Sequence, residues 1–258
     1  MTNRCLGRIR PTESERSLVP KLAKYVDALP AAPPSLDLTH GIPQWPTYLN
    51  TQLGDCTCAA VGHCEEVFSY AATGTPFIAQ DSDILALYET QGYVPGDPST
   101  DHGAVETSVL NQWRIHGFAN GRKLHSYASV DVSDLTLVRQ CTWIFYGLYI
   151  GIALPLSAQS QSEWDVDISA PSEETQPGSW GGHAVNVVGY STEGLTVITW
   201  GAPLTMTWRF WENYVDEAYA LIPNDFETLP NGKLLSNGFN ATQLQSDMDA
   251  ALSNIDIA

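Results

Sequence analysis

Residues 50–63 constrain this chain more than any other segment, because a polar, glycine-containing loop there runs straight into a helical pattern. The apolar residues after Cys56 are spaced like the buried face of one helix, and we expect that helix to end near Ala72. A cysteine at such a junction lies beside unpaired helix N–H groups and the positive end of the helix dipole, which stabilise a thiolate. The segment therefore predicts a buried helix with a candidate cysteine nucleophile, Cys56, at its start.

A candidate base for that cysteine is His183, which follows two glycines and precedes the apolar segment 184–190. A neutral imidazole can accept the proton of a thiol and leave a thiolate–imidazolium pair, which attacks acyl carbon atoms. The alternative interpretation is a histidine whose hydrogen bonds are satisfied at a strand end. The two residues together predict cysteine chemistry on an amide.

The five cysteines, at positions 5, 56, 58, 64 and 141, raise metal binding as an alternative. Cys56 and Cys58 are separated by one residue, which is shorter than the usual metal-binding spacing, and no second Cys/His cluster follows them. We therefore predict no metal site, no cofactor and no disulfide scaffold.

Charge and hydropathy limit the partners of the chain. The net charge of −17 argues against nucleic acid and anionic membranes as main partners. No run of eighteen apolar residues is present, and residues 1–18 are charged and unlike a signal peptide. We expect a soluble protein, cytoplasmic or virion-associated, whose substrate or partner is a peptide or protein. Self-association and virion assembly are further options.

The chain has 258 residues, 43% of them hydrophobic, which suffices for one large domain or two tightly packed lobes. Helical patterns fill the first half and strand patterns the second, which favours an α+β fold with two lobes. Besides the helix from Cys56, we expect helices at 84–90 and 104–116, one started by Ser133-Asp134, and one at 240–252. The expected strands are 126–132, 148–154, 184–190, 195–199 and 218–222.

The chain divides into three parts. Residues 1–34 form a basic N-terminal arm with half of the chain's twelve basic residues, and a short helix is expected over 18–29. Residues 35–222 form the main domain. Residues 223–258 form a C-terminal extension that ends in an amphipathic helix.

Several segments, taken in order, resemble the papain-like cysteine peptidases. They are Gly54-Asp55-Cys56-Thr57, Asp101-His102-Gly103, the strand opened by His183, the turn Thr199-Trp200-Gly201 and the closing strand Tyr219-Ala220-Leu221-Ile222. Together they cover about residues 35–222. The segments Leu53-Gly54-Asp55-Cys56-Thr57 and Asp216-Glu217-Ala218-Tyr219 are most similar to uncharacterised bacterial and phage papain-like proteins.

The resemblance implies a two-lobe papain-like fold, in which a helical lobe carries the cysteine helix and an antiparallel, β-barrel-like lobe carries the histidine. It implies a catalytic dyad of Cys56 and His183, with Asn50 stabilising the oxyanion and Thr199 next to the imidazole.

The resemblance also implies which residues border the substrate, namely Gly103, His102 and Trp180. Papain-like enzymes often carry inhibitory N-terminal segments, so the basic arm is expected to lie across the site.

Two departures from the family pattern leave alternatives open. Six positions before the nucleophile the family has a glutamine, which here is Asn50 for Cys56 but Gln52 if Cys58 is the nucleophile. The asparagine before the Trp-Gly turn is absent, and the hydroxyl of Thr199 orients an imidazole less well than a carboxamide does.

These departures leave more than one function class. The first is a cysteine peptidase or amidase that cleaves an amide through a thioester. The second is a catalytically silent papain-fold protein that binds or builds, for example an accessory protein of a phage capsid or tail. Acyl transfer to an amine uses the same dyad and stays open as a third class.

Overall fold

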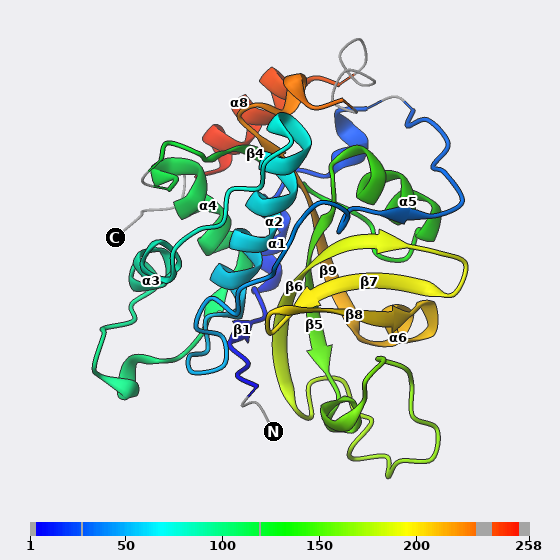
Figure 1. The fold of residues 1–258 in the computed structure, drawn as a ribbon. Coiled ribbons are helices and arrows are strands. Elements are labelled where there is room, and N and C mark those ends of the chain that lie inside the picture. The colour runs from blue at the N-terminus through cyan, green and yellow to red at the C-terminus, as the bar shows by residue number, and fades with distance from the viewer. Residues whose placement is uncertain (1–3, 27, 119, 231–238, 253–258) are drawn as a thin grey trace.

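The computed structural model describes residues 4–26, 28–118, 120–230 and 239–252. Helices pack on one side of a twisted antiparallel sheet, and further helices lie at its other side and its ends (Figure 1). The main helices are α1 (Glu13–Leu18), α2 (Cys56–Thr73), α3 (Asp81–Glu89), α4 (Glu106–His116), α5 (Leu135–Ile144), α6 (Trp208–Tyr214) and α8 (Ala241–Leu252). The strands are β1 (Arg8–Ile9), β2 (Leu36–Asp37), β3 (Ala104–Val105), β4 (Leu124–Ser129), β5 (Leu148–Leu154), β6 (Gly181–Tyr190), β7 (Gly194–Thr199), β8 (Ala202–Thr207) and β9 (Val215–Pro223).

Within the described residues, seven strands form one sheet in the order β4-β9-β5-β6-β7-β8, with β2 paired to β6. Trp200 and Gly201, with φ of 45° and 80°, form the two-residue turn between β7 and β8. Positive φ at both turn positions matches the right-handed twist of the flanking strands. The turn holds the Trp200 ring stacked on His183, at the start of β6.

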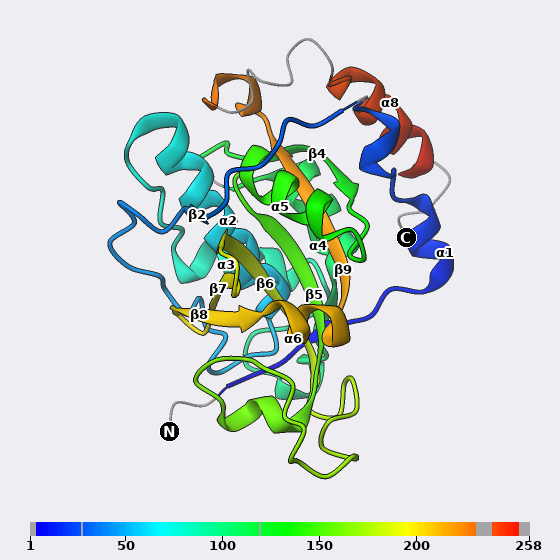
Figure 2. The same ribbon diagram turned by 90° about the vertical axis from the view of Figure 1, so that its right-hand side faces the viewer.

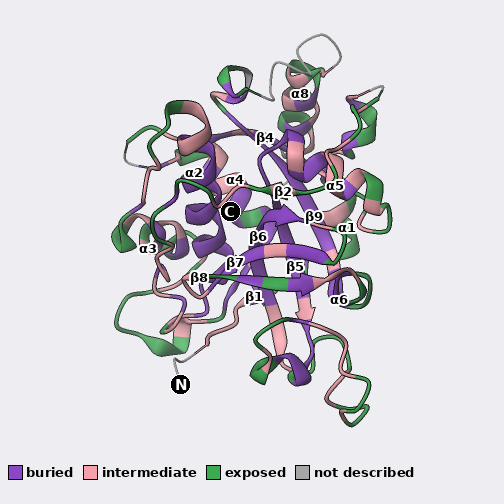
Figure 3. Cartoon of the chain, turned by 45° about the vertical axis from the view of Figure 1, so that its right-hand side comes forward, coloured by how far each residue is buried: buried purple, intermediate pink, exposed green. Residues whose placement is uncertain are grey.

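Helix α2 lies at the centre of the molecule, and every residue from Cys56 to Ser69 is buried (Figure 3). It packs against β6. Its first turn is tied to the sheet by Tyr149 on β5, whose hydroxyl donates to the carbonyl oxygen of Thr57 at 2.9 Å. The predicted helix from Cys56 and the predicted two-lobe α+β architecture are confirmed.

Two elements of the β-rich half were not predicted, β8 and α6. Strand β8 contains Pro203, and a proline argues against a central strand because it cannot donate to a neighbouring strand. The proline is tolerated because β8 lies at the edge of the sheet. Helix α6 begins where the hydroxyl of Thr207 accepts a hydrogen bond from the amide of Phe210.

The helix expected over residues 18–29 is wrong. The structure instead has α1 at Glu13–Leu18, started by a capping box in which Thr12 and Glu15 bond each other's backbone amides. Pro20 then ends the helical run, because it has no N–H to donate and restricts the residue before it. A short 3-10 helix, Leu22–Lys24, follows.

The N-terminal arm passes between the helices and the sheet. Its strand β1 pairs with β3 in parallel register, and Figure 2 shows the arm continuing across the molecule to α1, beside α8. The predicted C-terminal helix is confirmed as α8. The side-chain oxygen of Asn240 caps its first turn by accepting a hydrogen bond from the main-chain amide of Gln243. Of the extension proposed for residues 223–258, positions 231–238 and 253–258 lie outside the described residues.

Strand β9 has a β-bulge that the alternation rule does not foresee. Gly151 on β5 pairs with Glu217, whereas its neighbour Ile152 pairs with Val215, so Asp216 is the extra residue. Neighbouring residues of a regular strand face opposite ways, but a bulge redirects them. With the bulge, Asp216 and Glu217 both reach the same arginine of the arm, Arg8.

None of the helices among the described residues combines the length and apolar character needed to cross a bilayer.

We predict that Tyr149→Phe lowers the free energy of unfolding by about 1 kcal/mol, because it removes a buried hydrogen bond to the first turn of α2. Urea unfolding measures the change. Tyr214→Phe is the matched control, since its hydroxyl bonds the loop carbonyl of Thr175 away from α2. Equal losses in the two variants would contradict the special role of the Tyr149 contact.

Candidate active site at the start of helix α2

Cys56 is the first residue of α2, and only 1% of it is exposed. Burial raises the pKa of its thiol to about 12. Hydrogen bonds from the backbone of Ala184 and Gly7 act against that rise, and the negative charge of Asp55 adds to it. The thiol therefore sits between β6 of the main domain and the N-terminal arm, and it is neutral in this state.

His183 lies one residue before Ala184 on β6 and is also buried. Its Nε2 is 2.7 Å from the hydroxyl oxygen of Thr199, and its ring stacks on Trp200 with centroids 4.5 Å apart. Its Nδ1 is buried and has no hydrogen-bond partner among the described residues. Burial, followed by the positive charge of Arg4, lowers the pKa of His183 to about 3.

The start of α2 and the start of β6 therefore bring the two predicted residues to one place. Helix α2, which begins with Cys56, packs against β6, which carries His183, while Thr199 holds Nε2 of the imidazole. The second nitrogen is left to exchange a proton with a thiol. A cysteine nucleophile needs an imidazole nitrogen of this kind as its base.

Asn50 is engaged inside the loop that leads to Cys56. Its Nδ2 donates to the carbonyl oxygen of Leu53 and to Oδ1 of Asp55, both at 3.2 Å. The main-chain carbonyl oxygen of Asn50 accepts a hydrogen bond from the main-chain amide of Cys5 in the arm. Asn50 must give up one side-chain bond before it can donate to an oxyanion.

The alternative pair is arranged differently. Cys58 is fully buried inside α2, beside the hydroxyl of Thr57, and burial raises its pKa well above the ordinary range. Gln52 is exposed. Of the two cysteines, Cys56 is therefore the better candidate nucleophile.

The three residues predicted to border the substrate differ in how closely they approach the arm. Gly103 has φ of 81°, and a Cβ atom there would lie 1.9 Å from the carbonyl oxygen of Gly7. His102, next to it, is exposed. Trp180 packs on Trp200, whose ring in turn stacks on His183.

The arm lies directly on the site, as the resemblance implied. Gly7 is wedged against Gly54 so closely that a Cβ atom would fall 1.7 Å from the Gly54 carbonyl oxygen. The carbonyl oxygen of Gly7 accepts from the amide of Ala104 at 2.8 Å, and that of Cys5 accepts from the indole of Trp200 at 3.1 Å.

The carboxylate of Asp101 connects two loops of the site, a role that the sequence did not indicate. Its carboxylate accepts from the amide of Gly54 and from the hydroxyl of Tyr88. That hydroxyl in turn accepts from the amide of Gly103. The cysteine loop and the glycine loop are thus held together by one carboxylate and one phenol, a contact that no local sequence pattern indicates.

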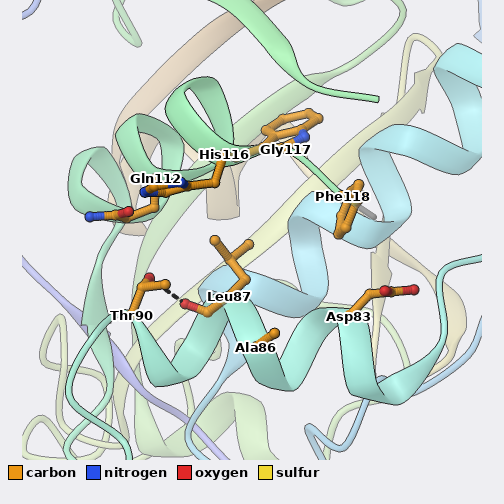
Figure 4. A pocket seen from close by; sticks show the side chains of 9 residues that line it. Asp83, Ala86, Leu87, Thr90, Gln112, His116, Gly117 and Phe118 are labelled. Atoms are coloured by element: carbon orange, nitrogen blue, oxygen red, sulfur yellow. Dashed lines mark hydrogen bonds between the residues drawn. The ribbon is translucent and has the colours of Figure 1, made fainter. Parts of the chain in front are cut away.

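A concavity lies away from these residues, between α3 and α4 (Figure 4). Its volume is about 250 Å³, and its lining includes Leu87, Gln112, His116 and Phe118. It contains none of the predicted site residues. Among the described residues, no group of three or more His, Cys, Asp or Glu side chains is placed to hold a metal ion.

The chain matches no protein-family model and no curated protein by sequence. It is similar in structure to xylellain, a cysteine protease from Xylella fastidiosa, with a TM-score of 0.61 and 17% identity over 86% of this chain and 98% of that one. It is also similar to the Amb a 11 cysteine protease, a major ragweed pollen allergen, in its proform, with a TM-score of 0.52 and 15% identity over 83% of this chain and 71% of that one. The chain therefore has the papain-like two-lobe fold that the sequence predicts.

We predict that Thr199→Val lowers the free energy of unfolding by about 1–3 kcal/mol, because the buried Nε2 of His183 then loses its partner. Urea unfolding at neutral pH measures the loss. The control is Thr196→Val, the same change at a half-buried position of the same strand. If both variants lose the same stability, the imidazole does not depend on Thr199.

Proposed function

We propose that the chain is a cysteine peptidase or amidase in which Cys56 is the nucleophile and His183 the base. The observation that carries the proposal is the packing of α2, which begins with Cys56, against β6, whose His183 has Nε2 held by Thr199 and a buried Nδ1 with no hydrogen-bond partner among the described residues. The papain-like fold supports the same assignment, since both structural neighbours are cysteine proteases.

In the proposed reaction, His183 takes the proton of Cys56, and the thiolate attacks the carbonyl carbon of an amide. The oxyanion is stabilised by the backbone N–H groups at the start of α2 and by Asn50, once its amide turns from Asp55. His183 then gives its proton to the leaving amine as the carbon–nitrogen bond breaks. Water attacks the resulting thioester, releases the acid and restores the thiol.

The described state is a resting state of that enzyme. A thiol pKa of about 12 leaves only about one thiolate in ten thousand at pH 8, and Arg4 of the arm opposes a positive charge on His183. Both effects disfavour the thiolate–imidazolium pair. Displacing the arm admits water, removes the charge of Arg4 and lets the pair form.

The alternative is a papain-fold protein that has kept the two residues without the chemistry and instead binds or builds, as in an accessory protein of a phage particle. The observation that favours this alternative is that the imidazole of His183 is held by the hydroxyl of Thr199, where papain-like enzymes have the carboxamide of an asparagine. An acyl transferase that uses the same dyad is the third class. Labelling of the cysteine separates the silent protein from the two active classes.

We predict that Gly7→Ala accelerates alkylation of Cys56 by iodoacetamide at pH 7 by at least about tenfold. An added methyl group cannot fit 1.7 Å from the Gly54 carbonyl oxygen, so the arm must move away from the thiol. Mass spectrometry assigns the labelled cysteine, and the rate is followed from pH 4 to 9. Ser17→Ala, on the exposed face of the arm, is the matched control and should leave the rate unchanged.

Second-site variants decide what the acceleration means. In the Gly7→Ala chain, His183→Ala should abolish labelling below pH 7, whereas Cys58→Ala should not affect it. Hydrolysis of fluorogenic peptide amides by the Gly7→Ala chain should likewise be lost with His183→Ala and kept with Cys58→Ala. An acyl transferase would attach an added amine to the acyl group of the peptide. Labelling that needs pH above about 8 and ignores His183 would mean a silent site.

A further inference from the structure

Arg8 of the arm, the residue after Gly7, is buried among three carboxylates. Its Nε lies 2.9 Å from Oε2 of Glu106 and 2.9 Å from Oε1 of Glu217. Its Nη2 lies 2.6 Å from Oδ1 of Asp216 and also pairs with Glu217. The Arg8 side chain is 2% exposed, and those of Glu106, Glu217 and Asp216 are 0%, 5% and 19% exposed.

Separate elements of the main domain build this pocket. Glu106 begins α4, directly after the glycine loop and β3, while Asp216 and Glu217 come from the bulge of β9. Gly151 on β5 leaves the space, because a Cβ atom there would lie 2.4 Å from Nε of Arg8 and from Oε2 of Glu106. The hydroxyl of Tyr219 donates to the second oxygen of Glu217 at 2.6 Å and fixes that carboxylate.

Arg8 is the cation that reaches all three carboxylates of the pocket, although Asp216 also pairs with Arg10 and Arg16. Burial raises the pKa of the Glu106 carboxyl well above its ordinary value. Oε1 of Glu106 is buried and has no hydrogen-bond partner among the described residues. Removal of Arg8 would leave the largely buried carboxylate of Glu217 without its cation, and removing one partner of a buried pair is strongly unfavourable because it leaves an uncompensated charge. The main domain therefore requires a cation here, and that cation comes from the arm.

The pocket adjoins the nucleophile. Gly7, the residue before Arg8, packs against Gly54, two residues before Cys56, and Arg8 itself pairs with β3 directly after Gly103. A chain that follows the same path past Cys56 places one side chain in this pocket, one residue away from the sulfur.

We propose that Glu106, Asp216 and Glu217 form the specificity pocket of this site, which selects peptides or proteins with an arginine next to the bond that Cys56 attacks. The proposal rests on the proposed peptidase or amidase function. Arg8 is then the chain's own copy of the selected side chain.

Arginine fits this pocket better than lysine does. Nε and Nη2 of the guanidinium meet different carboxylates at the same time. A lysine ammonium is a single point and cannot span the same set of oxygens. A neutral side chain leaves all three carboxylates without a cation.

The first experiment tests binding without any chemistry. Arg8→Ala empties the pocket, and thermal unfolding is recorded with added ethylguanidinium or with an equal concentration of ethylammonium. We expect ethylguanidinium to raise the Tm by about 3 °C or more and ethylammonium to do so far less. Arg10→Ala is the matched control, because Arg10 also pairs with Asp216 but is 65% exposed. A rise of the same size in both variants, or no rise in Arg8→Ala, would overturn the proposal.

The second experiment tests selection and does not require Arg8→Ala to fold. The Gly7→Ala chain is given paired peptide amides that differ only in arginine against citrulline, its neutral isostere, placed in turn at each position around the cleaved bond. We expect arginine at one position next to that bond to raise kcat/KM by at least about 100-fold, with lysine in between. Asp216→Asn in the same chain should reduce that ratio without abolishing hydrolysis.

The outcomes separate the two proposals. Hydrolysis with equal rates for arginine and citrulline keeps the peptidase and overturns the arginine pocket. Stabilisation of Arg8→Ala by ethylguanidinium, in a chain that hydrolyses nothing, keeps the guanidinium pocket as a binding site and overturns its role in substrate selection.

Discussion

The structure depends on the close packing of the first turn of α2 against β6. That packing buries Cys56 and sets the start of α2 against the strand that carries His183. Tyr149 fixes the same turn from β5, and Asp101 fixes the loop before it. Because interiors are densely packed, a shift of this turn would move the thiol, the strand and the glycine loop together. The geometry of the site is thus a property of the core rather than of mobile loops.

Burial of the site also determines its protonation state. A thiolate and an imidazolium are both charged, and each is disfavoured where water is excluded unless the other is already formed. The arm excludes water from Cys56 and adds the charge of Arg4, which stacks on Trp200 with the guanidinium carbon 4.8 Å from the ring centroid. The neutral pair is therefore a consequence of the docked arm. In the proposed enzyme, the same two side chains form the ionised pair once water and an acyl substrate replace that arm.

Local patterns in the sequence were sufficient for much of the fold. The junction at Cys56 and the apolar segment after His183 both mark elements whose periodicity survives in the structure. The pattern failed where tertiary context overrides propensity, as in edge strand β8 with Pro203 and in the arm, where the Thr12–Glu15 capping box places a helix before Pro20. The contact of Asp101 with Gly54 joins residues 47 positions apart and that of Arg8 with Glu217 joins residues 209 positions apart, so no local spacing could reveal them. A bulge at Asp216 added a second obstacle, because it breaks the alternation on which strand predictions rest.

The arginine pocket links restraint of the site to selection of its ligand. A tethered arginine competes at the high effective concentration that linkage gives, of the order of millimolar for a short flexible connection. An untethered peptide that lacks a cation would also have to leave Glu106, Asp216 and Glu217 uncompensated, at a cost that its other contacts must exceed. Only a ligand that brings its own guanidinium avoids that cost. The pocket therefore keeps neutral peptides away from Cys56 while the arm is docked, and it favours arginine-containing ligands when the arm leaves.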